Sequence, residues 1–161
     1  MDDKREIMST KNSIYTLVRI AKTSDVPDLV PLMDQLGYPA SHEELESRYK
    51  RFIKNDNYGV AVAVSEEKLI GFVAWSVSSL FVLDKVRFHI ESLVVNEKYR
   101  GCGIGKKLML FVEDIARDFS PAIIDLTSGL RRAKDGSHEF YKTLGYQNDG
   151  HMAKLYLRKE V

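Results

Sequence analysis

Hydrophobic residues recur along the chain with two different periodicities. Apolar residues at every second position indicate half-buried strands, and a repeat near 3.6 residues indicates helices. Val26, Leu29 and Leu36 lie on one such helical face, and Ser41 with Glu44 forms the signature of a capping box that opens a second helix. The expected strands span residues 15–20, 58–64, 69–77, 87–95, 122–127 and 151–157. The expected helices span residues 25–36 (capped by Thr23 or Ser24), 41–54, the segment between residues 100–105 and Pro121, and residues 138–144.

In chain order these elements are a strand, two helices, three strands, a helix, a strand, a helix and a strand. This order predicts an α/β fold, in the form of a mixed α+β sheet flanked by helices. The two strands on either side of the long helix are expected to run parallel, because a strand-helix-strand crossover returns in the same direction. Residues 1–13 are expected to form a polar tail, and residues 14–161 a single domain.

Composition narrows the classes of function. With 161 residues the chain can bury one sizeable core, and 44% apolar and 29% charged residues are ordinary for a soluble domain. A net charge of +1 argues against a nucleic-acid partner, and no apolar run reaches the roughly 18 residues of a membrane helix. The polar start of the chain is unlike a signal peptide, and the single cysteine, Cys102, can form no internal disulfide. We therefore expect a cytoplasmic protein without a membrane partner.

Residues 100–105, Arg-Gly-Cys-Gly-Ile-Gly, join an apolar strand to an amphipathic helix. Free backbone N–H groups and the positive end of the helix dipole would meet there, which predicts a phosphate site. The spacing excludes two common phosphate loops. A P-loop needs a longer gap between glycines and a Ser or Thr after Lys106, and a dinucleotide loop needs a third glycine that is absent here.

The segment instead resembles the Arg/Gln-x-x-Gly-x-Gly/Ala pyrophosphate loop of the GNAT family of N-acetyltransferases. Two more segments resemble that family: residues 138–146, His-Glu-Phe-Tyr-Lys-Thr-Leu-Gly-Tyr, and the strand at residues 90–95. The C-terminal half is also similar, more loosely, to aminoglycoside 6′-N-acetyltransferases. The resemblance implies the GNAT acyl-coenzyme A N-acyltransferase fold, whose mostly antiparallel central sheet has two splayed parallel strands with acetyl-coenzyme A between them.

The same resemblance implies an N-acetyltransferase that passes the acetyl group of acetyl-coenzyme A directly to a primary amine, with no metal. The acceptor would be a small-molecule or peptide amine, bound by the first two helices and the loop at residues 36–39 between them. A homodimer is left open. The alternative function is a non-catalytic acyl-coenzyme A binding or regulatory module, against which the presence of Glu91 and Tyr141 argues.

The resemblance also implies how the cofactor is held. Backbone N–H groups of the glycine-rich loop would bind the pyrophosphate, and Leu93 and Val95 would pair with the pantetheine arm as an added strand does. The N–H of Val94 would polarise the thioester carbonyl. The other cofactor-binding residues expected are Arg100, Gly101, Cys102, Gly103, Ile104, Gly105, Lys106, Ser128, His138 and Tyr141.

Glu91 is the candidate general base. Its strand neighbours are apolar, so an ionised carboxylate there needs a partner or water. Family members place a base at this position, often acting through water, and it would take the proton of the attacking ammonium. A substrate-binding charge or a structural salt bridge is the alternative. His89, two residues earlier on the same face, is either part of that relay or structural.

Tyr141 is the candidate general acid. A phenol keeps its proton at neutral pH and can give it to the departing thiolate, and family members use a tyrosine at this place. The alternative is a core aromatic. Cys102 has the position of a reactive thiol at a helix N-terminus, but no His–Asp pair accompanies it and the family forms no acyl-enzyme.

Overall fold

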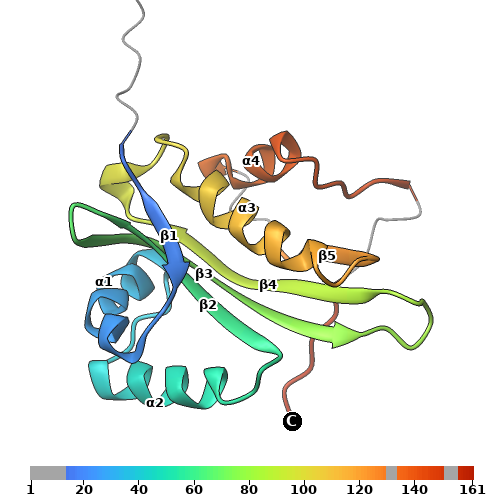
Figure 1. Cartoon of the computed structure of the whole chain (residues 1–161), viewed down its shortest axis with the longest axis horizontal. Helices are drawn as coiled ribbons and strands as arrows, with labels where there is room; N and C mark the ends of the chain where they lie inside the picture. The colour runs from blue at the N-terminus through green and yellow to red at the C-terminus, as the bar shows by residue number, and fades with distance from the viewer. Residues whose placement is uncertain (1–13, 130–133, 151–155) are drawn as a thin grey trace, which may run out of the picture. The chain divides into compact units, whose positions relative to one another are not determined.

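The computed structural model of the chain describes residues 14–129, 134–150 and 156–161. Its strands form one mixed sheet in the order β1-β2-β3-β4-β5, and β1 to β4 pair antiparallel (Figure 1). Within the described ranges, no helix is long and apolar enough to cross a membrane. The elements are β1 (Leu17–Ile20), η1 (Thr23–Asp25), α1 (Val26–Leu36), α2 (His42–Ile53), β2 (Tyr58–Ser65), β3 (Lys68–Ser79), β4 (Val86–Val95), η2 (Glu97–Tyr99), α3 (Ile104–Arg117), β5 (Ala122–Leu126) and α4 (Ser137–Thr143), where η marks a short 3-10 helix.

The chain divides into two compact units after Ile124. The first unit holds β1 to β4, the start of β5, and the helices α1, α2 and α3. The second unit holds the end of β5 and α4. The single domain expected over residues 14–161 stays a prediction, and the expected tail at residues 1–13 lies outside the described residues.

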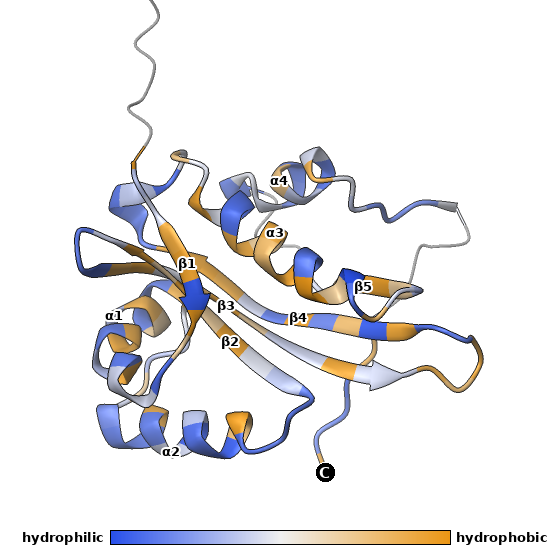
Figure 2. Ribbon diagram, in the orientation of Figure 1, coloured by the Kyte–Doolittle hydropathy of each residue, from blue (hydrophilic) through white to orange (hydrophobic). Residues whose placement is uncertain are grey.

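In the first unit, α1 and α2 cover one face of the sheet and α3 covers the other (Figure 1). On the first face, Leu32 of α1 and Tyr49 of α2 pack with Val62 and Phe72 from the strands. On the second face, α3 turns its buried side chains toward the sheet. Figure 2 shows apolar residues along the strands and polar residues over most of α2, as expected of a helix with one side in water. The buried side chains of α3 are Ile104, Leu108, Met109, Val112 and Ala116.

Most predicted helices and strands are confirmed, with ends shifted by a few residues. The first strand is shorter than expected and begins at Leu17, whereas β4 matches its prediction to within one residue. The last predicted strand, at residues 151–157, falls largely on residues 151–155, which lie outside the described ranges. Tyr156 and Leu157 are described and form no strand.

The two N-terminal helices begin differently from each other. The predicted capping box of α2 is confirmed: Glu44 N donates to Ser41 Oγ at 3.2 Å, and Ser41 N donates to Glu44 Oε2 at 2.9 Å. The predicted cap of α1 at Thr23 or Ser24 is wrong, because those residues form the 3-10 turn η1 and Asp25 takes the cap position.

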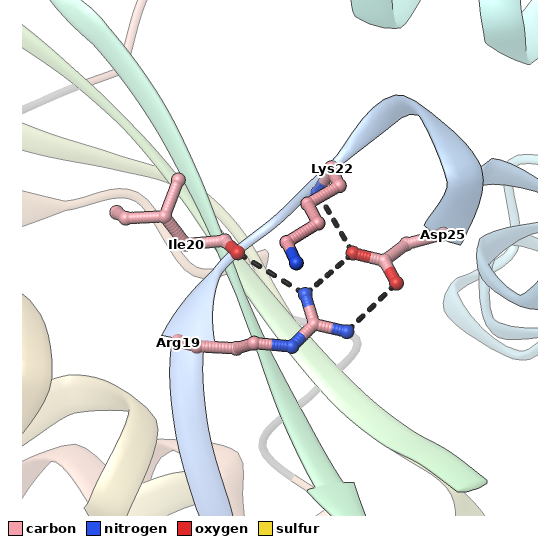
Figure 3. Close-up of polar contacts among 4 residues, drawn as sticks. All are labelled: Arg19, Ile20, Lys22 and Asp25. Carbon is pink, nitrogen blue, oxygen red and sulfur yellow. Dashed lines mark hydrogen bonds and ion pairs between the residues drawn. The ribbon is translucent and has the colours of Figure 1, made fainter. Parts of the chain in front are cut away.

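The Asp25 carboxylate does not cap the helix but joins β1 to the turn that follows it (Figure 3). It accepts hydrogen bonds from Arg19 Nη1 at 2.7 Å, from Arg19 Nη2 at 2.9 Å and from Lys22 N at 2.7 Å. The Asp25 side chain is only 11% exposed. Hydrogen bonding to Arg19 holds the pKa of Asp25 below its usual value, against the opposing effect of burial. This bidentate ion pair therefore fixes the path of the chain from β1 into α1.

Candidate functional site

Glu91 lies at an irregularity in the pairing of β3 with β4. Trp75 pairs with Ile90 and Ala74 pairs with Ser92, so two residues advance on β4 while one advances on β3. Glu91 is the extra residue of a β-bulge. An extra residue shifts the alternation of side chains between the two faces of the sheet.

The side chains of β4 show this change of face. Phe88, before the bulge, packs against Phe119 just beyond α3, with ring centroids 5.4 Å apart. Val94, after the bulge, belongs to the core under α1 and α2. Both residues have even numbers, and a regular strand would place them on the same face. Because of the bulge, Glu91 and Val94 both face the side of α1 and α2.

On that side Glu91 lines an open cleft of about 460 Å³. The other described residues of the lining are Arg48, Arg51 and Phe52 of α2 and Tyr58 at the start of β2. The predicted acceptor loop at residues 36–39 does not contribute to the described lining. The cleft therefore combines one carboxylate, two guanidinium groups and two aromatic rings.

The Glu91 carboxylate is oriented by the neighbouring strand. Ser76 Oγ of β3 donates a hydrogen bond of 2.6 Å to Glu91 Oε1. The second carboxylate oxygen, Oε2, has no hydrogen-bond donor among the described residues. His89 faces the same side one alternation earlier and contacts Arg87, with Arg87 Nη2 3.1 Å from His89 Nδ1. Among the described residues, no hydrogen bond or ion pair joins His89 to Glu91. A proton relay between them therefore stays a prediction.

The segment from β4 into α3 forms a tethered turn. Asn96 N donates to Ile70 O at 2.8 Å, and Glu97 N donates to Gln35 Oε1 of α1 at 2.9 Å. The Arg100 side chain reaches back, and its Nε donates to Val95 O at 3.2 Å. These bonds hold the glycine-rich loop against the end of the strand that carries Glu91.

The loop opens into the N-terminus of α3 as its sequence predicts. The residue before the helix, Gly103, has φ 78° and ψ 8°, a left-handed conformation that glycine adopts without a steric penalty. The first backbone bond of the helix runs from Lys107 N to Gly103 O at 3.1 Å. The N–H groups of Ile104, Gly105 and Lys106 therefore have no helical acceptor and are available to an anion.

Several residues of the predicted cofactor set in the first unit are half-buried or buried. Leu93 and Val95 are half-buried, and Val94 is 5% exposed in the core. Cys102 is half-buried, with its Sγ 3.9 Å from Arg100 O. In the parts of the chain that the structure describes, no group of three His, Cys, Asp or Glu residues is arranged to hold a metal ion.

The remaining predicted residues belong to the second unit. Tyr141 of α4 is half-buried, and its ring lies 5.1 Å from that of Phe140 and 6.1 Å from that of Tyr146. His138 Nε2, one turn earlier, lies 3.2 Å from Gly129 O. The Ser128 Oγ is buried and has no hydrogen-bond partner among the described residues. The second unit thus brings Ser128, His138 and Tyr141 onto adjoining segments.

The order of these features matches a known family. The sequence model of the Acetyltransferase (GNAT) family matches residues 27–146. The chain belongs to the GNAT family. Its activity is acetyl transfer to an amine, and the acetyl donor of the GNAT family is acetyl-coenzyme A.

Three solved structures illustrate the similarity. A GNAT family acetyltransferase of Staphylococcus aureus is 25% identical, with 91% of this chain and 98% of that chain covered and a TM-score of 0.75. Glucosamine-6-phosphate N-acetyltransferase of Arabidopsis thaliana is 21% identical, with coverage of 89% and 99% and a TM-score of 0.70. An aminoglycoside N-acetyltransferase in complex with coenzyme A is 15% identical, with coverage of 94% and 99% and a TM-score of 0.76. At the identities of the last two, the similarity concerns the fold alone, and the predicted GNAT fold is confirmed.

The sequence pattern does not single out the residues that surround Glu91. Ser76 is separated from it by 15 positions, and the hydrogen bond depends on the register of β3 against β4. Arg48 and Arg51 resemble ordinary charges of a surface helix in the sequence. The one available signal was their spacing: with Phe52 they lie on the same helical face, as residues three and four positions apart do.

Proposed function

We propose that this GNAT protein transfers acetyl directly from acetyl-coenzyme A to a primary amine, without an acyl-enzyme and without a metal. The observation that carries the proposal is the position of Glu91. Its carboxylate lines a cleft on the same strand that leads, through Leu93 to Val95, into the glycine-rich loop. A carboxylate at this position can accept the proton of the amine close to where the thioester of the family's cofactor would lie.

In this proposal the loop binds the pyrophosphate of the cofactor. The free N–H groups at the start of α3 would donate to the phosphate oxygens, and the positive end of the helix dipole favours their charge. Lys106 is exposed and adds a positive charge at the same place. The pantetheine arm would pair with the backbone of Leu93 and Val95, as the family resemblance implies.

The chemical steps balance without an outside reactant. Glu91, directly or through one water, takes a proton from the acceptor ammonium, and the freed lone pair attacks the thioester carbonyl carbon. The N–H of Val94 would stabilise the negative oxygen of the tetrahedral intermediate. The carbon–sulfur bond then breaks, and the coenzyme A thiolate receives the hydroxyl proton of Tyr141. The amide nitrogen releases its remaining extra proton to water, and water returns a proton to Tyr141, so that charges and protons balance. We propose that residues 14–161 form one domain.

The experiment is a free-thiol assay with acetyl-coenzyme A and a panel of small amines, amino acids, polyamines, aminoglycosides and peptide N-termini. Thiol release that depends on one amine class, and acetylation of that amine by mass, support the proposal. Tyr141→Phe deletes one hydroxyl and should lower kcat by roughly 100-fold, the low end for general-acid assistance. Tight binding of acetyl-coenzyme A with no turnover across the panel would favour the non-catalytic alternative.

Two further expectations belong to this proposal. We expect the protein to act in the cytoplasm, as its single cysteine suggests, and to use neither nucleic acid nor membrane as partner. Its state of assembly, monomer or homodimer, is measured by light scattering of the purified protein.

A further inference from the structure

The cleft beside Glu91 has an uneven charge. Its described lining has two guanidinium groups, from Arg48 and Arg51, and one carboxylate, from Glu91. Within the described residues, neither arginine has an ion-pair or hydrogen-bond partner, and no ion pair joins either of them to Glu91. The cleft thus contains two guanidinium groups whose hydrogen-bond donors are free within the described parts of the chain. It also contains the Glu91 carboxylate, which accepts a hydrogen bond from Ser76.

The two arginines are presented together by α2. Arg48 and Arg51 are three residues apart and lie on one face of the helix, where their like charges repel. The next residue on that face, Phe52, packs against Tyr58 with ring centroids 4.7 Å apart at 53°. Tyr58 remains 38% exposed. The rings therefore form an apolar wall in the cleft that also contains the arginines.

We propose that the acceptor is a small primary amine that also carries an anionic group, a carboxylate or a phosphate. This inference rests on the proposed function and names the acceptor class of the same site. The amine lies at Glu91, where its proton is removed, and the anionic group binds the paired guanidinium groups of Arg48 and Arg51. Guanidinium forks match the geometry of carboxylate and phosphate oxygens. The carbon skeleton between the two ends lies against Phe52 and Tyr58.

The same charges disfavour acceptors with several ammonium groups. A polyamine or an aminoglycoside would bring cations to Arg48 and Arg51, and like charges at short range repel. The volume of about 460 Å³ suits a molecule of amino-acid or amino-sugar size. The competing explanation is that both arginines are solvated surface charges near the C-terminal end of α2, where cations are favoured in any case.

The test uses pairs of amines that differ only in the anionic group: tyrosine with tyramine, and O-phosphoethanolamine with ethanolamine. For each pair we measure the ratio of kcat/KM for the amine with the anionic group to that for the amine without it. We expect a ratio of roughly tenfold or more in the natural protein, because hydrogen bonds to charged groups are among the stronger ones. In the double variant Arg48→Gln with Arg51→Gln the ratio should fall to near one.

The matched control is Lys50→Gln. Lys50 lies on the same helix but pairs with Glu46, with Lys50 Nζ 2.9 Å from Glu46 Oε1, and does not line the cleft. The Lys50→Gln substitution removes one positive charge from α2 and should leave the kcat/KM ratio unchanged. An equal fall in Lys50→Gln would show a general charge effect and overturn the inference.

A binding measurement separates this inference from the proposed function. Calorimetric titration of O-phosphoethanolamine into the protein with coenzyme A should give a Kd about tenfold weaker in the double arginine variant than in Lys50→Gln. If binding discriminates and no amine is turned over, the anionic subsite stands and acetyl transfer to this class fails. If the amines with and without the anionic group react and bind equally, the proposed acetyl transfer stands and the anionic acceptor is refuted.

Discussion

Ser76 Oγ lies 2.6 Å from Glu91 Oε1, across the one register shift between β3 and β4. The serine has no acidic or basic function of its own, but its O–H fixes one carboxylate oxygen. The other oxygen remains for a ligand or a water. Ser76 is therefore a positioning residue for the proposed base. It pairs with His89, and alternation along β4 puts Glu91 on the same face as His89.

Removal of the Ser76 hydroxyl should impair catalysis more than binding. In Ser76→Ala the Glu91 carboxylate loses its donor and samples other rotamers, so we expect kcat to fall by about tenfold, the equivalent of one hydrogen bond to a charged group. The KM for the acceptor should change less. Steady-state kinetics together with the pH–rate profile measure this, and Glu91→Gln should abolish the acid limb of that profile.

Ser76→Thr is the conservative control, because it keeps the hydroxyl and suits a β-strand. It should recover most of the lost kcat. If Ser76→Ala has the kcat and pH profile of the natural protein, the hydrogen bond has no role in catalysis.

The strand β4 is predictable from its sequence, but the β-bulge within it is not. The apolar, β-branched composition of residues 87–95 predicts the strand, and Glu91 stands out within it as a charged residue in a mostly apolar segment. The extra residue of the bulge is not predictable, because a bulge is a property of the pairing of two strands and has no signature in the sequence of either strand alone. Ser76, which donates to Glu91, and the two arginines of α2, which line the same cleft, come from segments distant in the sequence that only the folded chain brings together.

The glycine-rich loop yields a prediction on cofactor binding. Gly103 has a left-handed φ of 78°, which a β-branched residue avoids, and it precedes the free N–H groups of α3. In Gly103→Val the loop should rearrange and lose acetyl-coenzyme A. In the natural protein, cofactor at a hundred times its Kd should stabilise the fold by about 2.7 kcal/mol, measured by thermal or urea unfolding.

In the valine variant that stabilisation should vanish. Lys107→Gln serves as the control, since it changes a side chain of α3 beyond the free N–H groups and should keep most of the effect. Full stabilisation of Gly103→Val by acetyl-coenzyme A would place the cofactor elsewhere.

Gly59 yields a prediction on stability. It pairs with Trp75 across β2 and β3, and a Cβ at this position would lie 2.1 Å from Trp75 Cζ2. Trp75 is 5% exposed, so its rigid ring has little room to move. We expect Gly59→Ala to lower the free energy of unfolding by about 1–3 kcal/mol, as overpacking does. Urea unfolding measures it.

A smaller ring should relieve the contact. In the double variant Gly59→Ala with Trp75→Phe, the cost of the alanine should be smaller than in the natural background, which a double-mutant cycle quantifies. If the alanine costs the same in both backgrounds, the contact with Trp75 is not its cause.

The helix starts show why local signals succeed in one place and fail in another. The capping box of Ser41 and Glu44 is confirmed because both partners lie within four residues and need no other segment. At the start of α1 the cap predicted from the residue pattern is wrong. The residue at the cap position is Asp25, and its carboxylate binds Arg19 of β1 instead of capping the helix. That contact depends on how the chain turns between them, which the residue pattern does not specify.

The ion pair of Arg19 and Asp25 yields a prediction on pH. Asp25→Asn keeps the size of the side chain and removes its charge. Since charge-assisted hydrogen bonds contribute about 1.5–3 kcal/mol, the variant should be less stable than the natural protein by about 2 kcal/mol at pH 7. The pKa of Asp25 is held below its usual value in the folded protein, chiefly by its hydrogen bonds with Arg19. Its contribution is therefore fully present above the pKa of the unfolded chain, about 3.9, and is lost as the pH falls through the lower folded value.

The difference in unfolding free energy between the natural protein and Asp25→Asn should thus be constant from pH 7 to about pH 5 and shrink below about pH 4. Asp34→Asn is the matched control, an exposed acid of α1 whose loss should cost less than about 0.5 kcal/mol. Arg19→Gln should remove the same pH dependence, because the carboxylate then lacks the partner that lowers its pKa. Urea unfolding between pH 3 and pH 7 measures all three variants. A difference between the natural protein and Asp25→Asn that stays constant down to pH 3 would show that Asp25 stabilises the fold through its shape and not through its charge.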